Sequence, residues 1–581
     1  MPRFALLCVA SSIQTPLGIR NQILRKLLAW VCTMVLSMGQ LLAQEPDFKH
    51  PIQVSGGFNG STGFYTAFGA PSRRPPFTYS LNASLNFKVL GMIDVPFSAS
   101  FSQQQASFAQ PFNQYGISPK YKWITAHIGY RNMTFSDFTL AGHTFLGGGV
   151  ELTPGKWKIG AVAGRFRKAI EEADALANGA TTSYGRMGYG LQVGWENNGN
   201  GIEGCVFKAR DNVNSINAPT QSSDVTPEEG LVMGIKGKKK IGKKLDVEAE
   251  YAQSAITRDI RGPVAVNEGG GASSLSYFGG LFQRRSGSAS HAAYQGKINY
   301  KAKAFNLGLK YKHVDTDYRT LGAYFFANDV EDATLNGSTT LFKSKLNLSA
   351  SVGGQRNDLA HVKATRNSRL IYSANVGYAP SEKWNFSVNG SNFSSFLKVD
   401  QNILTDSLNF YQVTRNAAVN AMHMYGGEEN KQSLSANVSY QNAVGRKEYS
   451  ILPDNVTDFY NVALAHTLKL KKQNMDVSSM VSYTHTIVPG TTTSFIGPSA
   501  GVGKSILQKK AKVMFRTSFQ MIFTDGALSS TVFTNRLNGN YKLGKHHGIT
   551  ASIDFLRKSA VTTTTTKLSE MRGTVGYSFN F

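Results

Sequence analysis

Residues 77–89 read FTYSLNASLNFKV, a stretch in which apolar and polar side chains alternate without a break. Every odd position from Phe77 to Val89 is apolar, and every even position is polar. Because successive side chains of a β-strand point to opposite faces, this period of two predicts a strand with one apolar and one polar face. The same alternation returns at 346–352, 370–378 and 434–440, so we predict an all-β chain.

A soluble β-sandwich would show the same alternation, but the lengths favour a membrane barrel. The predicted strands run to about 10 to 14 residues, which suits a tilted crossing of the bilayer, whereas soluble strands more often have five or six. Short turns, such as 153–156 and 379–383, also alternate with longer polar loops at 212–229, 257–288 and 397–406. This alternation of turns and loops is typical of a transmembrane antiparallel β-barrel.

Aromatic residues cluster at the ends of the predicted strands, where an amphipathic ring would lie at the level of the lipid headgroups. We therefore predict an interface aromatic belt. Its members are Trp123, Trp157, Trp384, Tyr378 and Tyr440.

The last ten residues form one more alternating stretch that ends on a terminal Phe. Its apolar face consists of Val575, Tyr577, Phe579 and Phe581. This pattern resembles the C-terminal strand by which bacterial outer-membrane barrels are recognised by their assembly machinery. The resemblance implies that this machinery and the outer-membrane lipid are partners of the protein.

The strands can be counted by requiring turns and loops to alternate and both termini to lie in the periplasm. Twelve turns then give about 26 strands, an even number, with 22 to 26 as the accepted range because the segments at 104–116 and 407–424 are weak. The turns are expected near 90–95, 117–121, 153–156, 197–200, 242–243, 302–304, 343–345, 380–383, 425–431, 471–474, 506–508 and 543–546.

Residues 1–43 read as an export signal, with a basic flank, an apolar run at 27–36 and a small residue, Ala43, for cleavage. A single membrane anchor is the alternative, although the run is too short to span the bilayer. Cleavage would remove four basic residues and no acidic one, so the net charge of +25 would fall to +21. It would also leave Cys205 as the single cysteine of the barrel, predicted at 44–581, and would exclude an intramolecular disulfide.

The composition and the start of the barrel exclude several classes of protein. With 41% hydrophobic and 17% charged residues, the chain is not of the disordered type. Outside residues 1–43, no apolar run approaches the roughly 20 residues of a membrane-spanning helix. The first strand is expected at about 51–66, so we expect no separate plug domain of the kind that a TonB-dependent transporter carries. The periplasmic domain of a lipopolysaccharide-export barrel is not expected either.

The segment at 111–167 and a second block at 322–329 resemble a family of large, uncharacterised, porin-like outer-membrane β-barrels common in Bacteroidota. The first segment contains GISPKYKW, GYR and LAGHTF, and the second reads GAYFFAND. The family is defined by sequence and has no assigned catalytic or binding residues. The resemblance therefore implies the fold and a location in the Gram-negative outer membrane, and says little about the solute.

Motifs for catalysis, cofactors and metals are not found. The stretch GPSAGVGKS at 497–505 is similar to a phosphate-binding loop, but Pro498 stands where the motif needs Gly, and no helix is expected after it. The eleven His residues show no metal-ligand spacing, and His143 is interpreted as a lumen or girdle residue. We predict no catalytic, cofactor or metal site, and no enzyme.

The basic charge leaves two interpretations open. The Lys cluster at 236–244 and the cluster at 469–472 fall at predicted turns, where they could meet acidic headgroups at the rim. Alternatively, Lys and Arg in the lumen would create a positive potential that favours anions. Nothing besides the charge suggests nucleic acid, which is not expected as a partner.

The sequence therefore predicts a porin-like channel for polar or anionic solutes. The alternative is a non-conducting structural or accessory barrel that acts as a partner in a secretion or surface-assembly complex, with a protein docking on its long loops. So wide a barrel needs inward-folded loops to narrow its lumen. The segments at 257–288 and 397–430 are the candidates.

Overall fold

A computed structural model gives the fold of the chain. It describes residues 47–103, 113–178, 180–217, 225–265, 280–324, 327–357, 359–360, 368–398, 409–447, 455–561 and 567–581. The predicted export signal at 1–43 lies outside the described residues.

One closed antiparallel sheet forms the molecule, and each strand pairs with the next along the chain. The two short strands β4 and β5 share one place in the sheet, because both lie between β3 and β6. The described residues therefore form a barrel of 26 strands, which confirms the predicted class and count.

The bounds of the strands are as follows: β1 Ile52–Phe68, β2 Phe77–Val89, β3 Ile93–Ser102, β4 Gln114–Ile117, β5 Lys120–Tyr121, β6 Ile124–Thr134, β7 Ala141–Leu152, β8 Trp157–Arg167, β9 Arg186–Asn197, β10 Asn200–Asp211, β11 Glu229–Ile241, β12 Leu245–Thr257, β13 Ser288–Lys301, β14 Phe305–Val314, β15 Val330–Leu341, β16 Leu346–Arg356, β17 Ser368–Ser381, β18 Trp384–Lys398, β19 Asn409–Tyr425, β20 Asn430–Lys447, β21 Asn455–Leu470, β22 Met475–Val488, β23 Thr491–Ile506, β24 Ala511–Thr524, β25 Ala527–Leu543, β26 His547–Ala560 and β27 Leu568–Asn580.

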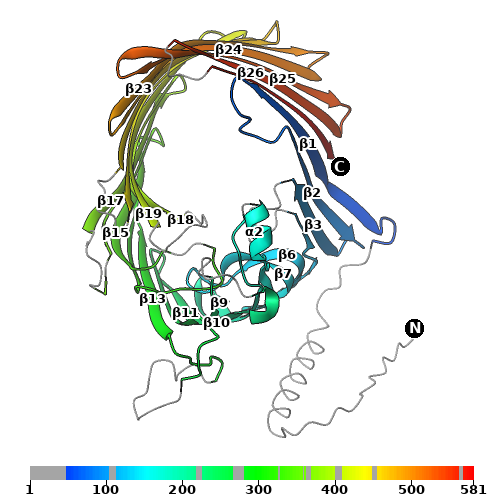
Figure 1. Cartoon of the computed structure of the whole chain (residues 1–581), viewed down its shortest axis with the longest axis vertical. Helices are drawn as coiled ribbons and strands as arrows, with labels where there is room; N and C mark the ends of the chain where they lie inside the picture. Colours follow the sequence, from blue (N-terminus) through cyan, green and yellow to red (C-terminus); the bar gives the residue numbers. More distant parts are fainter. Residues whose placement is uncertain are drawn as a thin grey trace.

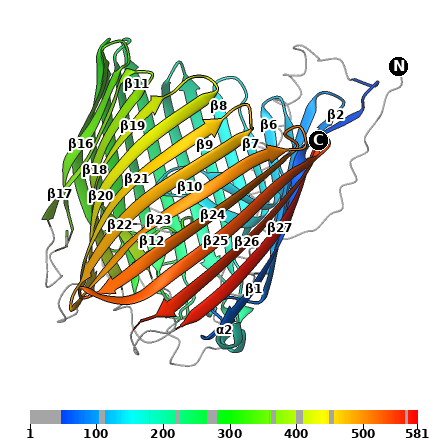
Figure 2. The same ribbon diagram turned by 90° about the horizontal axis from the view of Figure 1, so that it is seen from above.

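The barrel closes where the last strand, β27, pairs with the first, β1. Twelve residue pairs join the two strands, from Gly57 opposite Asn580 to Phe68 opposite Ser569. Figure 2 shows the strands tilted across the wall, as barrel closure requires. The start of β1 and the end of β27 both lie beside short turns, since the amide of Leu90 bonds to the carbonyl of Pro51 and that of Asn580 to the carbonyl of His546.

Short turns lie at one end of the barrel, here called the turn end, and longer connections lie mainly at the other, here called the loop end. Eleven of the twelve expected turns are present at their places, and those at 153–156, 302–304 and 471–474 have the predicted bounds. The expected turn at 117–121 is displaced to 122–123. Residues 118–119 instead separate β4 from β5, the two short strands that share one place in the sheet. The weak segment at 407–424 falls largely within β19 rather than in a loop.

In the described part of the chain, two helical segments that were not expected in an all-β chain occupy loops. The helix α2, Glu172–Asn178, lies between β8 and β9, and the 3-10 helix η1, Val213–Ser215, follows β10. Among the described residues, no helix has the length and apolar character needed to cross a membrane.

The outer face of the barrel is apolar along its whole circumference. On neighbouring strands, Val438, Val462 and Val481 point outward and are 51%, 45% and 54% exposed. A closed antiparallel sheet satisfies all its backbone donors and acceptors, and only such a sheet or a helix can cross hydrocarbon. The chain is therefore a transmembrane β-barrel of the Gram-negative outer-membrane type.

A matched pair of lysine substitutions tests which face meets lipid. In the middle of β20, Val438 points outward and its neighbour Ser439 points into the lumen. We expect Val438→Lys to lower the free energy of unfolding by about 2–4 kcal/mol, because a Lys at mid-bilayer must face hydrocarbon. Ser439→Lys should change it by less than about 1 kcal/mol, since its ammonium faces water. Denaturant titration in lipid vesicles measures both, and equal losses would contradict the assigned faces.

Candidate functional site in the barrel lumen

Two connections fold into the barrel and cover part of its inner wall. They are residues 135–140, between β6 and β7, and residues 315–324, between β14 and β15; we call them the inward-folded loops. Phe135 and Leu140 of the first loop and Leu321 of the second are at most 6% exposed. They pack on lumen-facing side chains of β6 to β12. The remaining buried members of this cluster are Met133, Phe145, Val162, Phe166, Phe207, Ala209 and Ile256.

A second apolar cluster continues along the same wall. Phe138 and Tyr318, one from each inward-folded loop, are both fully buried, with ring centroids 6.3 Å apart. They cover inward-facing residues of β11 to β15, which are Val232, Ala252, Ala293, Val314 and Val330. One part of the lumen thus contains a hydrophobic core, which most of the rest of the inner wall lacks.

Glycines on the inner wall allow the first loop to approach closely. A Cβ atom on Gly190 of β9 would lie 2.7 Å from the Phe135 ring, and one on Gly234 of β11 would lie 3.0 Å from the Thr139 methyl group. Real Cβ atoms essentially never approach a neighbour to less than 3.0 Å. The position of the loop therefore depends on glycine, which has no Cβ atom, at residue 190.

Hydrogen bonds join the two inward-folded loops to each other. The Tyr318 hydroxyl donates to the carbonyl of Phe138 at 2.8 Å, and the Thr320 hydroxyl donates to the carbonyl of Thr139 at 2.6 Å. These bonds satisfy carbonyl oxygens that are buried away from water. The two loops therefore form one unit.

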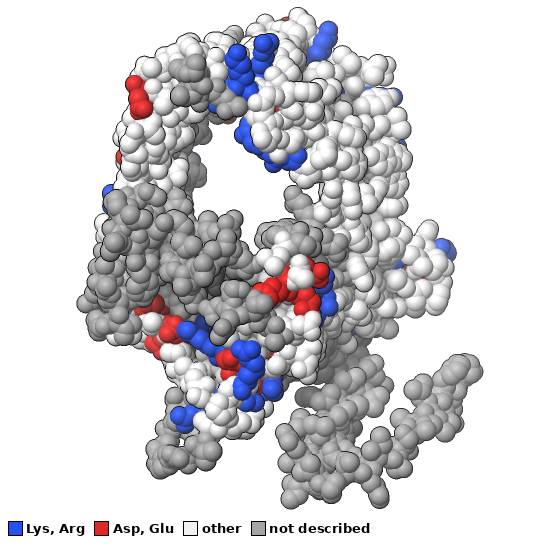
Figure 3. Space-filling view, in the orientation of Figure 1, with Lys and Arg blue, Asp and Glu red and all other residues white. Residues whose placement is uncertain are grey.

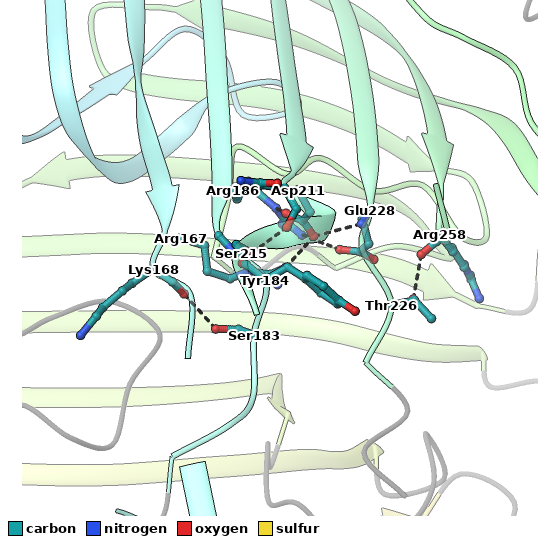
Figure 4. Close-up of polar contacts among 12 residues, drawn as sticks. Arg167, Lys168, Ser183, Tyr184, Arg186, Asp211, Ser215, Thr226, Glu228 and Arg258 are labelled. Carbon is teal, nitrogen blue, oxygen red and sulfur yellow. Dashed lines mark hydrogen bonds and ion pairs between the residues drawn. The ribbon is translucent and has the colours of Figure 1, made fainter. Parts of the chain in front are cut away.

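A buried ion-pair network anchors this unit at the loop end of the barrel (Figure 4). Asp211, whose side chain is 0% exposed, accepts two bonds from Arg186, at 2.7 and 3.0 Å, and one from Arg167 at 2.7 Å. Glu228 accepts from Arg186 and from Arg319, both at 2.7 Å. Because Arg319 belongs to the second inward-folded loop, the network ties that loop to β8, β9 and β10.

Charge keeps the network ionised. Burial alone would raise the pKa of Glu228, but Arg319, Arg186 and Arg167 outweigh it and hold the pKa below its ordinary value. Glu228 therefore gives up its charge only as the pH falls below the usual range for a glutamate.

An opening runs through the barrel beside the inward-folded loops (Figure 3). Its free wall, which the loops do not cover, carries mostly Asn, Ser and Thr at inward positions of β16 to β23. Asn420, for example, accepts a hydrogen bond from Asn437 and donates one to Ser387 at 3.3 Å. Figure 3 also shows Lys and Arg atoms gathered at the upper border of the opening.

Two open grooves follow the inner wall, and both are lined mainly by amide and hydroxyl groups. The larger, of about 640 Å³, lies along β1 to β7 and β27. Its polar lining residues are Asn59, Asn82, Ser84, Ser98, Ser100, Gln114, Tyr115, Tyr130, Arg131, Asn132, Thr144, Ser578 and Asn580. The smaller, of about 290 Å³, lies along β13 to β17. The arrangement can therefore hydrogen-bond a polar solute along the wall.

The lysine clusters lie chiefly at the turn end. The twelve turns contain thirteen Lys and three Glu. The Lys residues are 122, 156, 243, 244, 303, 343, 345, 383, 471, 472, 509, 510 and 545. Some pair across neighbouring turns, as Lys472 does with Glu429 at 2.7 Å. The turns therefore carry a net charge of +10 out of the chain's +25, so part of the excess positive charge lies at a rim, as one of the two interpretations expected.

The residues of the C-terminal face lie on one side of the closing strand. Val575, Tyr577 and Phe579 point outward from β27, and the amide of Phe581 bonds to the carbonyl of Gly56. Their recognition by assembly machinery stays a prediction.

The predicted belt residues do not all share one level. Trp157, Trp384 and Tyr378 are exposed on the outer face near the turn end, and Trp123 lies in a turn. Tyr440 also faces outward, but in the loop-end half of β20, where its hydroxyl donates to Asp458 at 2.8 Å. A contact with lipid headgroups stays a prediction for all five.

The described parts of the two expected lumen-filling segments do not fill the lumen, whereas residues 266–279 of the 257–288 segment lie outside the described residues. Residues 409–425 and 430–447 are strands, and residues 399–408 lie outside the described part of the chain. At the described end of the 257–288 segment, Phe282 packs on the outward-facing Leu231 and Ala255, so this part covers the outside. The signal that was missed is the run of glycines at inward positions of β9, which are Gly188, Gly190 and Gly194.

Two further expectations concern chemistry. The stretch at 497–505 lies within β23, so its glycines form no phosphate-binding loop. His143 faces the lumen, as interpreted, and its ring stacks on Tyr324 with centroids 3.9 Å apart. Within the described ranges, no group of three or more His, Cys, Asp and Glu is placed to hold a metal ion.

A substitution of Gly190 tests whether the inner wall holds the first inward-folded loop. The thiol of Cys205, the lone cysteine of residues 44–581, lies 3.4 Å from the Thr139 hydroxyl beneath this loop. We expect Gly190→Ala to push Phe135 away and to speed the labelling of Cys205 by a water-soluble maleimide about tenfold. Gly377→Ala is the control, because its Cβ would meet open space. Equal labelling rates in the two variants would contradict the role of Gly190.

The buried network makes a second prediction. We expect Asp211→Asn to lower the free energy of unfolding by about 3–5 kcal/mol, because Arg167 and Arg186 lose a buried charged partner. In the control Asp259→Asn, an exposed carboxylate loses a local pair with Arg261, and the loss should stay under about 1 kcal/mol. Urea unfolding measures both, and similar values would mean that the network does not anchor the loop.

Comparisons with known proteins concern the fold alone. No family model and no curated protein matches the chain. Among solved structures, the FrpB iron transporter from Neisseria meningitidis in its apoprotein form is 13% identical, with a TM-score of 0.37 over 91% of this chain and 81% of that chain. OccK9 (OpdG) from Pseudomonas aeruginosa is 9% identical, with a TM-score of 0.29 over 68% of this chain and 98% of that chain. A mutant of the ferric enterobactin receptor PfeA from Pseudomonas aeruginosa is 10% identical, with a TM-score of 0.37 over 90% and 80%.

Proposed function

We propose that this chain is a porin-like channel that lets small polar solutes, with a preference for anions, cross the outer membrane by diffusion. The observation that carries the proposal is the opening beside the inward-folded loops, with its wall of Asn, Ser and Thr. Amides and hydroxyls replace part of the hydration shell of a passing solute without binding it tightly.

The inward-folded loops support a permanent passage rather than a closed one. They narrow a barrel that would otherwise be wide enough to leak. They are held by two apolar clusters and a buried ion-pair network, so they act as a fixed constriction. A rigid constriction sets an upper size for the solutes.

The alternative function is a non-conducting accessory barrel in a secretion or surface-assembly complex. The long connections at the loop end would then dock another protein. The exposed ion pair of Arg258 with Asp317, at 2.8 Å, lies on that surface. No contact in the described residues points to a particular partner, so the channel is the function we favour.

Membership of the Bacteroidota-type family, an export signal at 1–43 and recognition of the C-terminal strand by barrel-assembly machinery belong to the same proposal. They fit a barrel whose last strand, β27, completes the sheet by pairing with β1. The protein is proposed to act without enzymatic chemistry.

Single-channel recording tests the proposal. We expect residues 44–581, refolded and inserted in a planar bilayer, to give a stable open current without added ligand, because the passage is already present. The variant Gly190→Ala should conduct more than the native protein, since its loop is displaced. Silence from both proteins would contradict the channel. Current from Gly190→Ala alone would mean a barrel that the loops close, and would favour the accessory role.

A further inference from the structure

Four charged side chains occupy one level of the lumen wall on adjacent strands. Arg516 of β24 is opposite Arg536 of β25, which is opposite Asp554 of β26, which is opposite Arg572 of β27. Neighbouring strands lie about 4.8 Å apart, so this row spans roughly 14 Å of the wall. We call these four residues the arginine row.

All four side chains face the lumen. Their chain neighbours Phe515, Leu537, Ile553 and Met571 are exposed on the outer face, so the alternation of a strand directs the arginine row inward. The three arginines are exposed and the aspartate is half-buried. In Figure 1, β24 to β26 border the opening on the side opposite α2 and the inward-folded loops.

The arginine row has more positive than negative charge. Asp554 forms an ion pair with Arg536. Within the described residues, neither Arg516 nor Arg572 has a carboxylate at ion-pair distance. Glu570, the next acidic inward residue on β27, already pairs with Arg73 at 2.9 Å and accepts from the Tyr65 hydroxyl.

The wall around the row is otherwise neutral at this height. Towards the turn end, the adjacent inward positions are Met514, Asn538, Ser552 and Thr574. On the described wall from β16 to β23, charged inward side chains occur only next to the turns, at Lys431, Lys469 and Asp476. The arginine row is therefore a local feature of the passage and not part of a uniformly basic wall.

Arg516 and Arg536 are two like charges directly opposite each other, and among the described residues Asp554 pairs with Arg536 alone. Like charges directly opposite each other on two strands destabilise a sheet. Within the described residues no carboxylate pairs with Arg516, and a local conflict of this kind is typical of a functional position. An anion bound between the two guanidinium groups would remove the repulsion.

We propose that the arginine row is a binding site for small oxyanions, carboxylates or phosphates, along the passage. This inference names the solute class of the channel and so rests on the proposed function. The planar guanidinium fork bonds a carboxylate or phosphate through two parallel N–H donors. The arginines are exposed to lumen water and contact the solute from one wall of the barrel. Binding is therefore weak, and the solute is released.

Ion selectivity is the first test. A salt gradient across a bilayer that holds the full barrel gives the ratio of anion to cation permeability. We expect Arg516→Gln/Arg536→Gln/Arg572→Gln to lower this ratio about tenfold, since only the negative Asp554 remains on the row. Asp554→Asn should raise the ratio, which separates an electrostatic role from a general loss of folding.

A matched control removes three charges from the turns of the same strands. In Lys509→Gln/Lys510→Gln/Lys545→Gln the lost charges lie at the rim, outside the lumen. We expect this variant to change the permeability ratio by less than about twofold, because water and salt screen rim charges. Equal effects of the rim and row variants would overturn the inference.

Direct binding is the second test and needs no current. Succinate and inorganic phosphate are titrated calorimetrically into the detergent-solubilised barrel, with uncharged succinamide as the control solute. A heat of binding that either anion gives with the native protein, and that is lost in the triple arginine variant, supports the site. Comparison of the heats of succinate and phosphate shows whether the site prefers a carboxylate or a phosphate. No difference between native protein and variant would overturn it. Binding without conductance would contradict the channel but not the site.

Discussion

The hydrocarbon interior of a membrane offers no partner for a backbone amide or carbonyl, and the rest of this structure depends on that constraint. The sheet can have no free edge, so β27 must pair with β1 along twelve residues. Contact with lipid also requires apolar side chains on the outer face. Every second position of a strand is therefore constrained by the membrane and not by function. Only the inward positions are free to vary, and their side chains determine the chemistry of the lumen.

The inner wall uses that freedom in two ways. Along β7 to β15 it carries Val, Ala and Gly, which provide a surface onto which the inward-folded loops can pack as a core would. Along β16 to β23 it carries mainly amides and hydroxyls that bond to one another and to water. The loop end closes the first region with ion pairs, in which Asp211 and Glu228 each accept from two arginines. A barrel that looks uniform from outside thus contains two different interiors.

The strands could be predicted from the sequence because each obeys a local rule. The alternation from Phe77 to Val89 can be recognised without knowledge of any other segment. The turn at 302–304 likewise lies where it was expected, between two strands. The inward-folded loops could not be predicted in this way. The place of Phe135 depends on Gly160 and Gly190, which belong to strands reached only after intervening turns and loops. The arginine row was missed for the same reason, because its members lie 18 to 20 residues apart and meet only through the register of four strands. The helix α2 has only 7 residues and no apolar period that would distinguish it from a loop.

The unequal covering of the inner wall has a mechanical consequence. Where the inward-folded loops lie, the wall is two layers thick and resists bending, whereas the described residues of β16 to β27 form a single layer held by hydrogen bonds and a few ion pairs. A change in the lateral pressure of the bilayer therefore deforms mainly the thin side. The thick side acts as a rigid frame, and the cross-section of the passage varies through the thin side as the membrane is compressed or stretched. For the proposed channel, the conductance would then depend on the tension of the surrounding lipid.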